Sequence, residues 1–272
     1  MSNLKGLRVL LVRPGSAFGQ SETQDRDHFS SQLIDDGVVL HHYPVMTVSP
    51  LISSPEIDQI KSYILNFALY DKVLFVSRTA ARLALDWLDR YWSVPEGLPV
   101  GTRYYAVGKS TAAELKKWHI EAELPIQAYS SEGLLALPSL QKLPDERVLI
   151  FSGVGGRQLL SEELSCRGAA VSQCSLYRRQ PTDVYAGNIN SLLLSTELDL
   201  VIVHSGELLS NLMSLVPKEQ QQVLWQLPLF VPSERVCELA RDAGFNNVIC
   251  AGSALPEDMV SALRGWYSNK IK

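Results

Sequence analysis

The sequence predicts an α/β fold built on parallel β-sheets. Short apolar runs rich in β-branched residues recur along the whole chain, and a segment with helical spacing follows most of them. These runs also lack the strict alternation of a strand that has one face in water, as expected for strands covered on both faces. Strands that alternate with helices are typical of parallel sheets. At roughly 150 residues per domain, a length of 272 residues suggests two domains.

The elements follow one another along the chain in a regular order. Several of the expected helices end next to glycine, as at Gly168 and Gly244, which is the residue that most often follows a helix. Strands are expected at residues 7–12, 73–76, 104–107, 148–151, 200–203, 229–231 and 248–251, and helices at 79–91, 110–118, 158–166, 207–215 and 234–243.

A turn containing glycine, serine or basic residues follows nearly every expected strand. Ligands of open α/β sheets bind at the carboxyl ends of the strands, and the free amides that begin the next helix favour anions. The turns therefore predict a shared anion-binding face, with the alternative that the serines at 77, 110, 205 and 233 are only helix N-caps. The candidate binding residues are Arg13, Pro14, Ser77, Gly108, Lys109, Ser110, Gly153, Gly155, Gly156, Arg157, Ser205, Gly206 and Ser233.

Two extended stretches, at 38–44 and 171–177, divide the chain. Only one strand and one helix precede the first stretch, which is too little to bury a core, so residues 1–37 are expected to fold with the C-terminal third. The prediction is a discontinuous first lobe at 1–37 and 178–272, a second lobe at 45–170, and two linker strands that form a hinge below a common cleft.

Composition excludes several classes of protein. A net charge of −4, with no basic run longer than Arg178-Arg179, argues against a nucleic-acid partner. No apolar run reaches the roughly 18 residues of a membrane helix. Arg13-Pro14 stands where a signal peptide would need small residues, so a cytoplasmic protein is expected. The cysteines at 166, 174, 237 and 250 form no CxxC pair, and their spacing predicts reduced thiols rather than a zinc site.

Several common motifs are incomplete. Gly108-Lys109-Ser110 lacks the glycine that a phosphate-binding P-loop has five positions before its second glycine, and Gln158 stands where the dinucleotide-binding fingerprint needs its third glycine. The chain contains no GxSxG nucleophile elbow. His204, at a strand end beside Ser205, is the histidine most relevant to a site.

The order and spacing of several segments resemble the uroporphyrinogen-III synthase family, in its bacterial branch, over nearly the whole chain. One departure is His204, where the family more often has a small hydroxyl residue. The segments are Val12-Arg13-Pro14, Ala106 to Ala112, Gly153 to Arg157, Arg167-Gly168-Ala169, Leu176 to Arg179, Ser205 to Leu209, Leu215-Val216-Pro217 and Ser233-Glu234-Arg235.

The resemblance implies two flavodoxin-like α/β lobes joined by a two-stranded ladder. It implies a lyase that cyclises hydroxymethylbilane to uroporphyrinogen III, in heme and porphyrin biosynthesis, with inversion of the last ring (ring D) and loss of water. No metal or organic cofactor is implied. The expected partner is the substrate, with transient contact to hydroxymethylbilane synthase, and the chain is expected to be a monomer.

This chemistry suits a cleft lined by helix N-termini, because every ring of the substrate carries two carboxylates. Arg13, Lys109 and Arg157 are candidate partners for them, with the alternative that these side chains only face solvent. Tyr177 matches the family's recurrent tyrosine and is expected to protonate the leaving hydroxyl, unless it only packs at the hinge with its hydroxyl bonded to the backbone. Thr111 is the second candidate, either bonding a carboxylate or the leaving group or only stabilising a helix start. The competing function is a two-lobed protein that binds an anion without chemistry.

Overall fold

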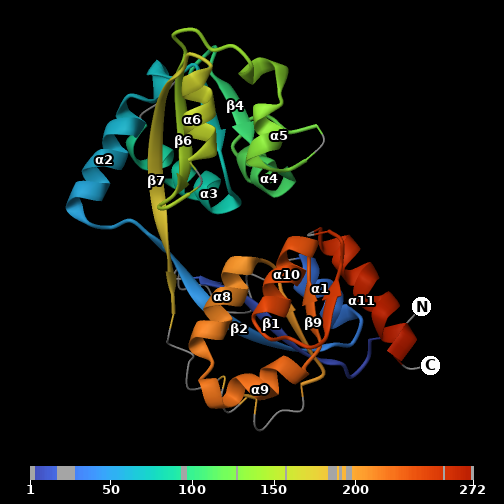
Figure 1. Ribbon diagram of the computed structural model, residues 1–272. Coiled ribbons are helices and arrows are strands. Elements are labelled where there is room, and N and C mark those ends of the chain that lie inside the picture. The colour runs from blue at the N-terminus through green and yellow to red at the C-terminus, as the bar shows by residue number, and fades with distance from the viewer. Residues whose placement is uncertain are drawn as a thin grey trace. The chain divides into compact units, whose positions relative to one another are not determined.

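The computed structural model describes residues 4–16, 28–92, 97–126, 128–156, 158–182, 189, 192–193, 198–253 and 255–270. The chain divides into two compact units, one made of Met1–Val48 with Gln180–Lys272 and the other of Ser49–Arg179. We call them unit 1 and unit 2 and describe each by itself. Helices alternate with strands in both units, which confirms the predicted α/β class (Figure 1).

Unit 1 is a parallel sheet with helices on both faces. Its strands lie in the order β10-β9-β8-β1-β2. They are β1 (Arg8–Ser16), β2 (Val39–Pro50), β8 (Leu200–Val203), β9 (Leu229–Val231) and β10 (Val248–Cys250), and the helices are α1 (His28–Asp35), α8 (Gly206–Leu215), α9 (Lys218–Gln226), α10 (Glu234–Asp242) and α11 (Pro256–Lys270).

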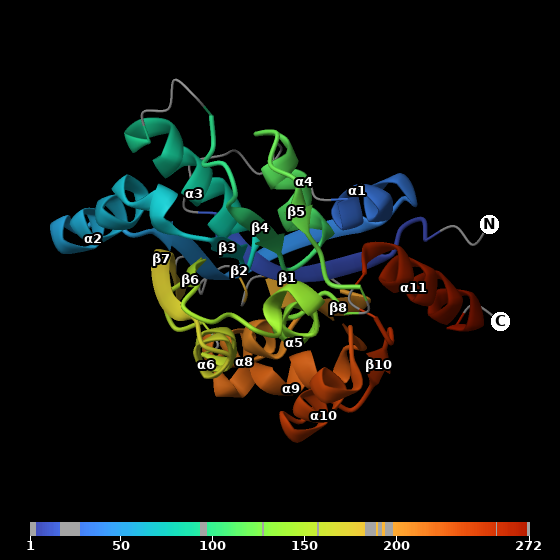
Figure 2. The ribbon, with the colours of Figure 1, turned by 90° about the horizontal axis from the view of Figure 1, so that it is seen from above.

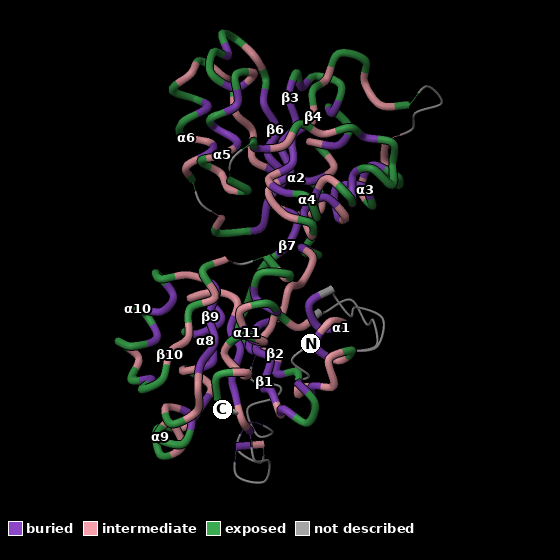
Figure 3. Tube along the Cα trace, turned by 90° about the vertical axis from the view of Figure 1, so that its right-hand side faces the viewer, coloured by how far each residue is buried: buried purple, intermediate pink, exposed green. Residues whose placement is uncertain are grey.

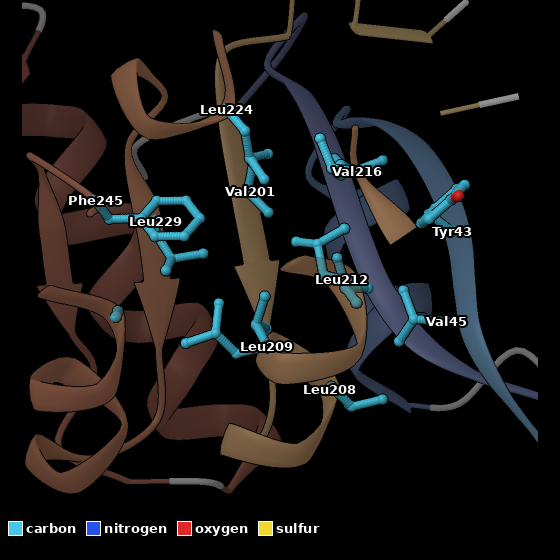
Figure 4. Close-up of a cluster of buried hydrophobic side chains, with 14 of the residues drawn as sticks. Tyr43, Val45, Val201, Leu208, Leu209, Leu212, Val216, Leu224, Leu229 and Phe245 are labelled. Carbon is cyan, nitrogen blue, oxygen red and sulfur yellow. The ribbon is translucent and has the colours of Figure 1, made fainter. Parts of the chain in front are cut away.

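Alternate residues of β1 pack into different cores of unit 1. Leu10 and Val12 join a cluster with side chains from α8, α9 and α10. Val9 and Leu11 join another cluster, with side chains from α1 and α11. Figure 2 shows α1 on the opposite side of β1 from α8, α9 and α10, and Figure 4 shows part of the first cluster, with Val201 above the side chains of α8. Burial on both faces explains why these strands read as continuous apolar runs.

Unit 2 repeats this architecture with the strand order β7-β6-β3-β4-β5. One face of its sheet is covered by α5 and α6, and on the other Phe75 stacks on Phe151 next to Phe67. Its elements are α2 (Ser54–Leu65), η1 (Phe67–Leu69), β3 (Lys72–Phe75), α3 (Arg78–Tyr91), β4 (Arg103–Ala106), α4 (Lys109–Lys116), β5 (Ala122–Glu123), α5 (Ser131–Leu135), η2 (Pro138–Leu140), β6 (Arg147–Gly153), α6 (Leu159–Cys166) and β7 (Ala170–Pro181). Buried residues are concentrated in the strands, and most exposed residues lie on the helices and turns (Figure 3).

The chain passes between the units through β2 and β7, which are neighbours in the strand order. Both strands have 12 residues and are longer than the stretches expected at 38–44 and 171–177. Within unit 2 the Leu51 amide donates to the carbonyl of Leu176 at 3.0 Å, and within unit 1 the Thr182 amide donates to the carbonyl of Val45 at 3.3 Å.

The strand predicted at residues 7–12 is too short, because β1 continues through Ser16, where a turn was expected to follow that strand. Its pairing with β8 ends at Val12, so that beyond this point β2 is the neighbour to which β1 is paired. The register with β2 shifts between Arg13 and Pro14. A proline, which has no amide to donate, is tolerated where one side of a strand is open and the ladder is irregular.

Among the residues that the structure describes, no helix is long and apolar enough to cross a lipid bilayer.

Candidate functional site

A pocket of about 260 Å³ lies in unit 2 at the carboxyl ends of two neighbouring strands. Val76 follows β3, Ser152 and Gly153 end β6, and Tyr177 and Arg179 come from β7. The volume lies below the roughly 300–1,000 Å³ of sites that enclose a whole drug-sized ligand. The pocket can therefore hold one part of a larger molecule, such as a single substituted ring.

The hydroxyl of Tyr177 lies between two polar side chains of the same unit. The Oη atom is 3.1 Å from Ser77 Oγ, and Arg179 Nη2 donates a hydrogen bond to it at 3.3 Å. The guanidinium carbon of Arg179 lies 5.7 Å from the centre of the tyrosine ring. Since Tyr177 is only 1% exposed, its phenol is oriented by packing as well as by these bonds. The alternative for Tyr177, a hydroxyl bonded to the backbone, does not match these two side-chain partners.

The glycine-rich segment after β6 is shaped around this tyrosine. A β-carbon on Gly153 would lie 2.6 Å from Cε2 of the Tyr177 ring, so a side chain has no room there. The amide of Val154 donates to the carbonyl of Tyr177 at 2.8 Å. Gly155 has a φ of +72°, which favours glycine, and the Gly156 amide donates to the carbonyl of Gly153 at 3.3 Å. Gly153 itself is the last residue of β6 rather than part of a turn.

Ser77 has two functions in the structure. It is the N-cap of α3, where its Oγ accepts a hydrogen bond from the amide of Ala80 at 2.9 Å. The same oxygen is the neighbour of the Tyr177 hydroxyl. The cap and the site interpretation of this serine are therefore compatible.

The start of α4 differs from the prediction. Gly108, with extended backbone (φ −166°, ψ 172°), is the N-cap, so the expectation that Ser110 caps the helix is wrong. Lys109 and Ser110 are exposed in the first turn, and Lys109 Nζ lies 5.6 Å from the centre of the Tyr129 ring. Thr111 is 1% exposed, which places its side chain in the interior of unit 2.

The two serine turns of unit 1 differ in their hydrogen bonds. Ser205 caps α8 and accepts from the amide of Leu208 at 3.3 Å. Gly206 begins that helix, and a β-carbon there would lie 2.7 Å from Cδ1 of Leu239. Ser233 occupies the N-cap position of α10, but its side chain makes no capping bond. The Ser233 hydroxyl is thus not needed to hold the helix start.

Arg13 and His204 both contact Phe29 in unit 1. The guanidinium carbon of Arg13 lies 5.8 Å from the centre of the phenyl ring, and the imidazole of His204 packs edge-on against it at 4.8 Å. Burial and, to a smaller extent, the positive charge of Arg13 together lower the pKa of His204 to about 4. Within the described part of the chain, His204 Nε2 has no hydrogen-bond partner. His204 is therefore neutral at pH 7. Arg157 lies outside the described residues.

Comparison with known proteins identifies the family. The family described as HEM4, uroporphyrinogen-III synthase HemD, matches residues 27–261. The chain belongs to the uroporphyrinogen-III synthase family. It is 30% identical over 263 residues to the uroporphyrinogen-III synthase of Escherichia coli, which covers 95% of this chain and 100% of the relative. It is 31% identical over 261 residues to that of Salmonella typhimurium, with the same coverage.

Solved structures of this family share the fold. A mutant uroporphyrinogen III synthase from Thermus thermophilus superimposes with a TM-score of 0.62 at 18% identity, covering 96% of this chain and 98% of that one. A uroporphyrinogen-III synthetase from Helicobacter pylori gives 0.59 at 12% identity, covering 96% and 99%. The predicted fold class, two flavodoxin-like α/β lobes with a discontinuous first lobe, is confirmed.

Arg179, which donates a hydrogen bond to the Tyr177 hydroxyl, was not among the site residues predicted from the sequence. Residues two apart in a strand point to the same face, so Arg179 follows Tyr177 on one side of β7. That spacing was the available signal. The bond between Ser77 and Tyr177 joins residues 100 positions apart, and nothing in the local sequence indicates it.

Proposed function

We propose that this member of the uroporphyrinogen-III synthase family is a lyase that cyclises hydroxymethylbilane to uroporphyrinogen III, with inversion of ring D and loss of water. Family membership supports the reaction. The single structural observation that supports the assignment of its chemistry is the phenol of Tyr177, held at a pocket between Ser77 and Arg179.

Tyr177 is proposed as the general acid. Its Oη gives a proton to the hydroxyl of the hydroxymethyl group, the C–O bond breaks, and water leaves. The electron pair of the pyrrole stabilises the azafulvene cation that remains. The hydrogen bond from the Arg179 guanidinium stabilises the negative charge left on the phenolic oxygen.

The remaining steps depend more on the orientation of the substrate than on an acidic or basic side chain. The methylene carbon of the azafulvene, on the first ring, forms a carbon–carbon bond to the substituted α-carbon of ring D, which gives a spiro intermediate. The bond from this α-carbon to its former bridging methylene then breaks, and that methylene bonds to the free α-carbon of ring D, which inverts the ring. The carbon that has formed this last bond gives its proton to the Tyr177 phenolate, which restores the phenol. Uncatalysed closure gives isomer I, so holding one folded substrate geometry is the main catalytic contribution.

The helix starts are proposed as carboxylate ligands. In unit 2 the start of α4 offers backbone amides beside the exposed Lys109 and Ser110. In unit 1 the starts of α8 and α10 offer amides, and Ser233 adds a hydroxyl that no helix bond occupies. Each carboxylate gains about 0.3–1 kcal/mol from a helix end. For Thr111, its burial supports the second of its two expected roles, which is to stabilise the start of α4.

The decisive experiment is a product assay. The purified chain is given freshly prepared hydroxymethylbilane, and isomers III and I are separated after oxidation. We expect isomer III, formed faster than the spontaneous closure. Isomer I alone, at the rate seen without protein, would reject the activity.

We also propose that the chain acts as a monomer in the cytoplasm and contacts hydroxymethylbilane synthase transiently. The substrate closes by itself to the wrong isomer, so a short transfer from the enzyme that releases it limits that loss. The molar mass of the chain, measured by light scattering after size-exclusion chromatography, tests whether it is a monomer. Fractionation of cells tests the compartment, and crosslinking with and without active hydroxymethylbilane synthase tests the contact.

A further inference from the structure

Three metal-ligating side chains converge in unit 1. They are Glu234, Cys237 and Cys250, and one ligand atom of each lies within 4.8 Å of the other two. Glu234 and Cys237 are three residues apart in the first turn of α10, so they share one face of the helix. Cys250 ends β10 and pairs with Val231, the last residue of β9, after which the chain turns into α10. The fold thus brings a strand end and a helix start together.

The donor set is of the kind that zinc prefers. Thiolate and carboxylate are common ligands of Zn²⁺, and three protein ligands leave a fourth position for water. At a Zn–S distance of about 2.3 Å, two sulfurs of a tetrahedral site lie about 3.8 Å apart. The ligand atoms in unit 1 lie within 4.8 Å of one another, so closing the site requires each pair to approach by about 1 Å at most. Cys237 is completely buried and Cys250 is exposed, which gives one fixed ligand and a path of entry from solvent.

A cation that binds to these three residues must displace a thiol proton and compete with an existing ion pair. Burial raises the pKa of Cys237, and the neighbouring Cys250 thiol raises it further, so the Cys237 thiol is protonated without a metal. A cation must therefore release the proton of the Cys237 thiol to the solvent as it binds. Glu234 also pairs with Arg241 Nη1 at 2.9 Å. Both partners of that pair are more than half exposed, and such pairs hold weakly, so the carboxylate is available to a metal.

We propose that Glu234, Cys237 and Cys250 form a binding site for a thiophilic divalent cation of the zinc class, which ties the first turn of α10 to the end of β10. The spacing of the cysteines along the chain predicts no zinc site, and it gives no indication of this one because the proposed ligands come from two elements that only the sheet brings together. Glu234 follows Ser233, the proposed carboxylate ligand at the start of α10, and none of the three residues takes part in the proton transfer proposed for Tyr177.

Binding of Co²⁺ to the reduced full-length chain tests the proposal. Cobalt takes the place of zinc and gives a thiolate-to-metal charge-transfer band in the near ultraviolet, which reports sulfur ligands directly. We expect this band to grow to one equivalent of Co²⁺ and to disappear when Zn²⁺ is added. Cys250→Ser and Cys237→Ser should each lose at least half of its intensity. Cys166→Ser, which changes an exposed cysteine of unit 2, is the matched control and should keep it all.

The two side chains around the thiols give a finer test. Loss of a residue that only supports a metal ligand costs roughly 10–100-fold in affinity. Glu234 is itself a proposed ligand, so Glu234→Gln should weaken Zn²⁺ binding by at least about 10-fold. Arg241→Gln should leave the affinity equal or higher, since it removes the competing cation.

Three outcomes would overturn the proposal. They are the absence of the band in the wild type at millimolar Co²⁺, a band that persists in both cysteine variants, and a reduced chain that binds no metal while air oxidation joins Cys237 to Cys250. Circular dichroism separates loss of ligand from loss of fold. Cys250→Ser changes an exposed side chain, so its outcome stands even if the buried Cys237→Ser fails to fold. None of these readouts depends on turnover.

Discussion

The ring of Tyr177 lies so close to Gly153 that a β-carbon at that position would be 2.6 Å from ring atom Cε2. The last residue of β6 is thus part of the wall that orients the proposed general acid on β7. The register of these two strands shifts at this point, between Ser152 and Gly153. The glycine is therefore needed for the shape of the pocket, whatever its amide does for a ligand.

Gly153→Ala should lower both stability and turnover. Overpacking costs typically 1–3 kcal/mol, and the ring of Tyr177 must move to relieve the clash. Gly265→Ala is the control, because a β-carbon there meets nothing within 4 Å and alanine favours the helix. Urea unfolding and the isomer assay measure the two effects. Unchanged stability and turnover in Gly153→Ala would show that the ring is not confined as described.

Tyr177→Phe should slow the formation of isomer III without abolishing it. General acids typically contribute about 10²–10⁴-fold, and a phenol is a weak acid, so we expect a loss on the order of 10²-fold. Isomer I should form a larger share of the product, since spontaneous closure then competes better. Tyr63→Phe, on α2, removes a hydroxyl outside the pocket and should be neutral. Equal rates for the two variants would remove Tyr177 from the mechanism.

Arg179→Gln should lower turnover more than Arg178→Gln. The Arg179 guanidinium donates to the phenolic oxygen of Tyr177, whereas that of Arg178 pairs with Glu56 at 2.8 Å. We expect a loss of roughly tenfold for Arg179→Gln, equivalent to about 1.4 kcal/mol, which lies near the low end for a hydrogen bond to a charged group. Single-turnover rates of both variants decide. A larger loss in Arg178→Gln would contradict the assignment.

Ser205→Ala and Ser233→Ala should separate a capping serine from a binding one. Ser205 accepts a hydrogen bond from the Leu208 amide, so its loss should cost about 1 kcal/mol of stability. Ser233 makes no such bond, so its loss should change stability by no more than a few tenths of a kcal/mol and should raise KM instead. Urea titration and initial rates test both. A stability loss in Ser233→Ala as large as that in Ser205→Ala would show that Ser233 caps α10 in solution.

His204 should make unit 1 less stable in acid. Its pKa is about 4 in the folded chain and 6.5 in the unfolded one, so below pH 6.5 the unfolded chain binds a proton that the folded chain does not. Stability is therefore lost as the pH falls from 6.5 towards 4, by up to about 3 kcal/mol. The comparison is His204→Phe, which keeps an aromatic ring against Phe29. Its free energy of unfolding should fall less over this range, and parallel pH curves for the two proteins would contradict the shift.

Several elements followed from local sequence. The strand at 200–203 has the predicted bounds, since its apolar run is short, β-branched and followed by a capping serine. Ser77 and Ser205 cap the helices they were expected to cap, because an N-cap depends only on residues within one turn. The predicted strand at 7–12 stopped before residues 13–16, which belong to β1. Local sequence does not show that Pro14 lies in a strand, because this depends on β2 still pairing with β1 after the pairing with β8 has ended.

By itself the sequence determined the alternation of strands and helices, the α/β class and the resemblance to one enzyme family, because each depends on spacing along the chain. The tertiary structure alone decided which distant side chains meet. Ser77 reaches Tyr177 because β3 and β7 both flank β6, and Cys250 reaches Cys237 because β10 pairs with the strand that leads into α10. Contacts of this kind arise from the order of strands in a sheet, and no local pattern of residues encodes that order.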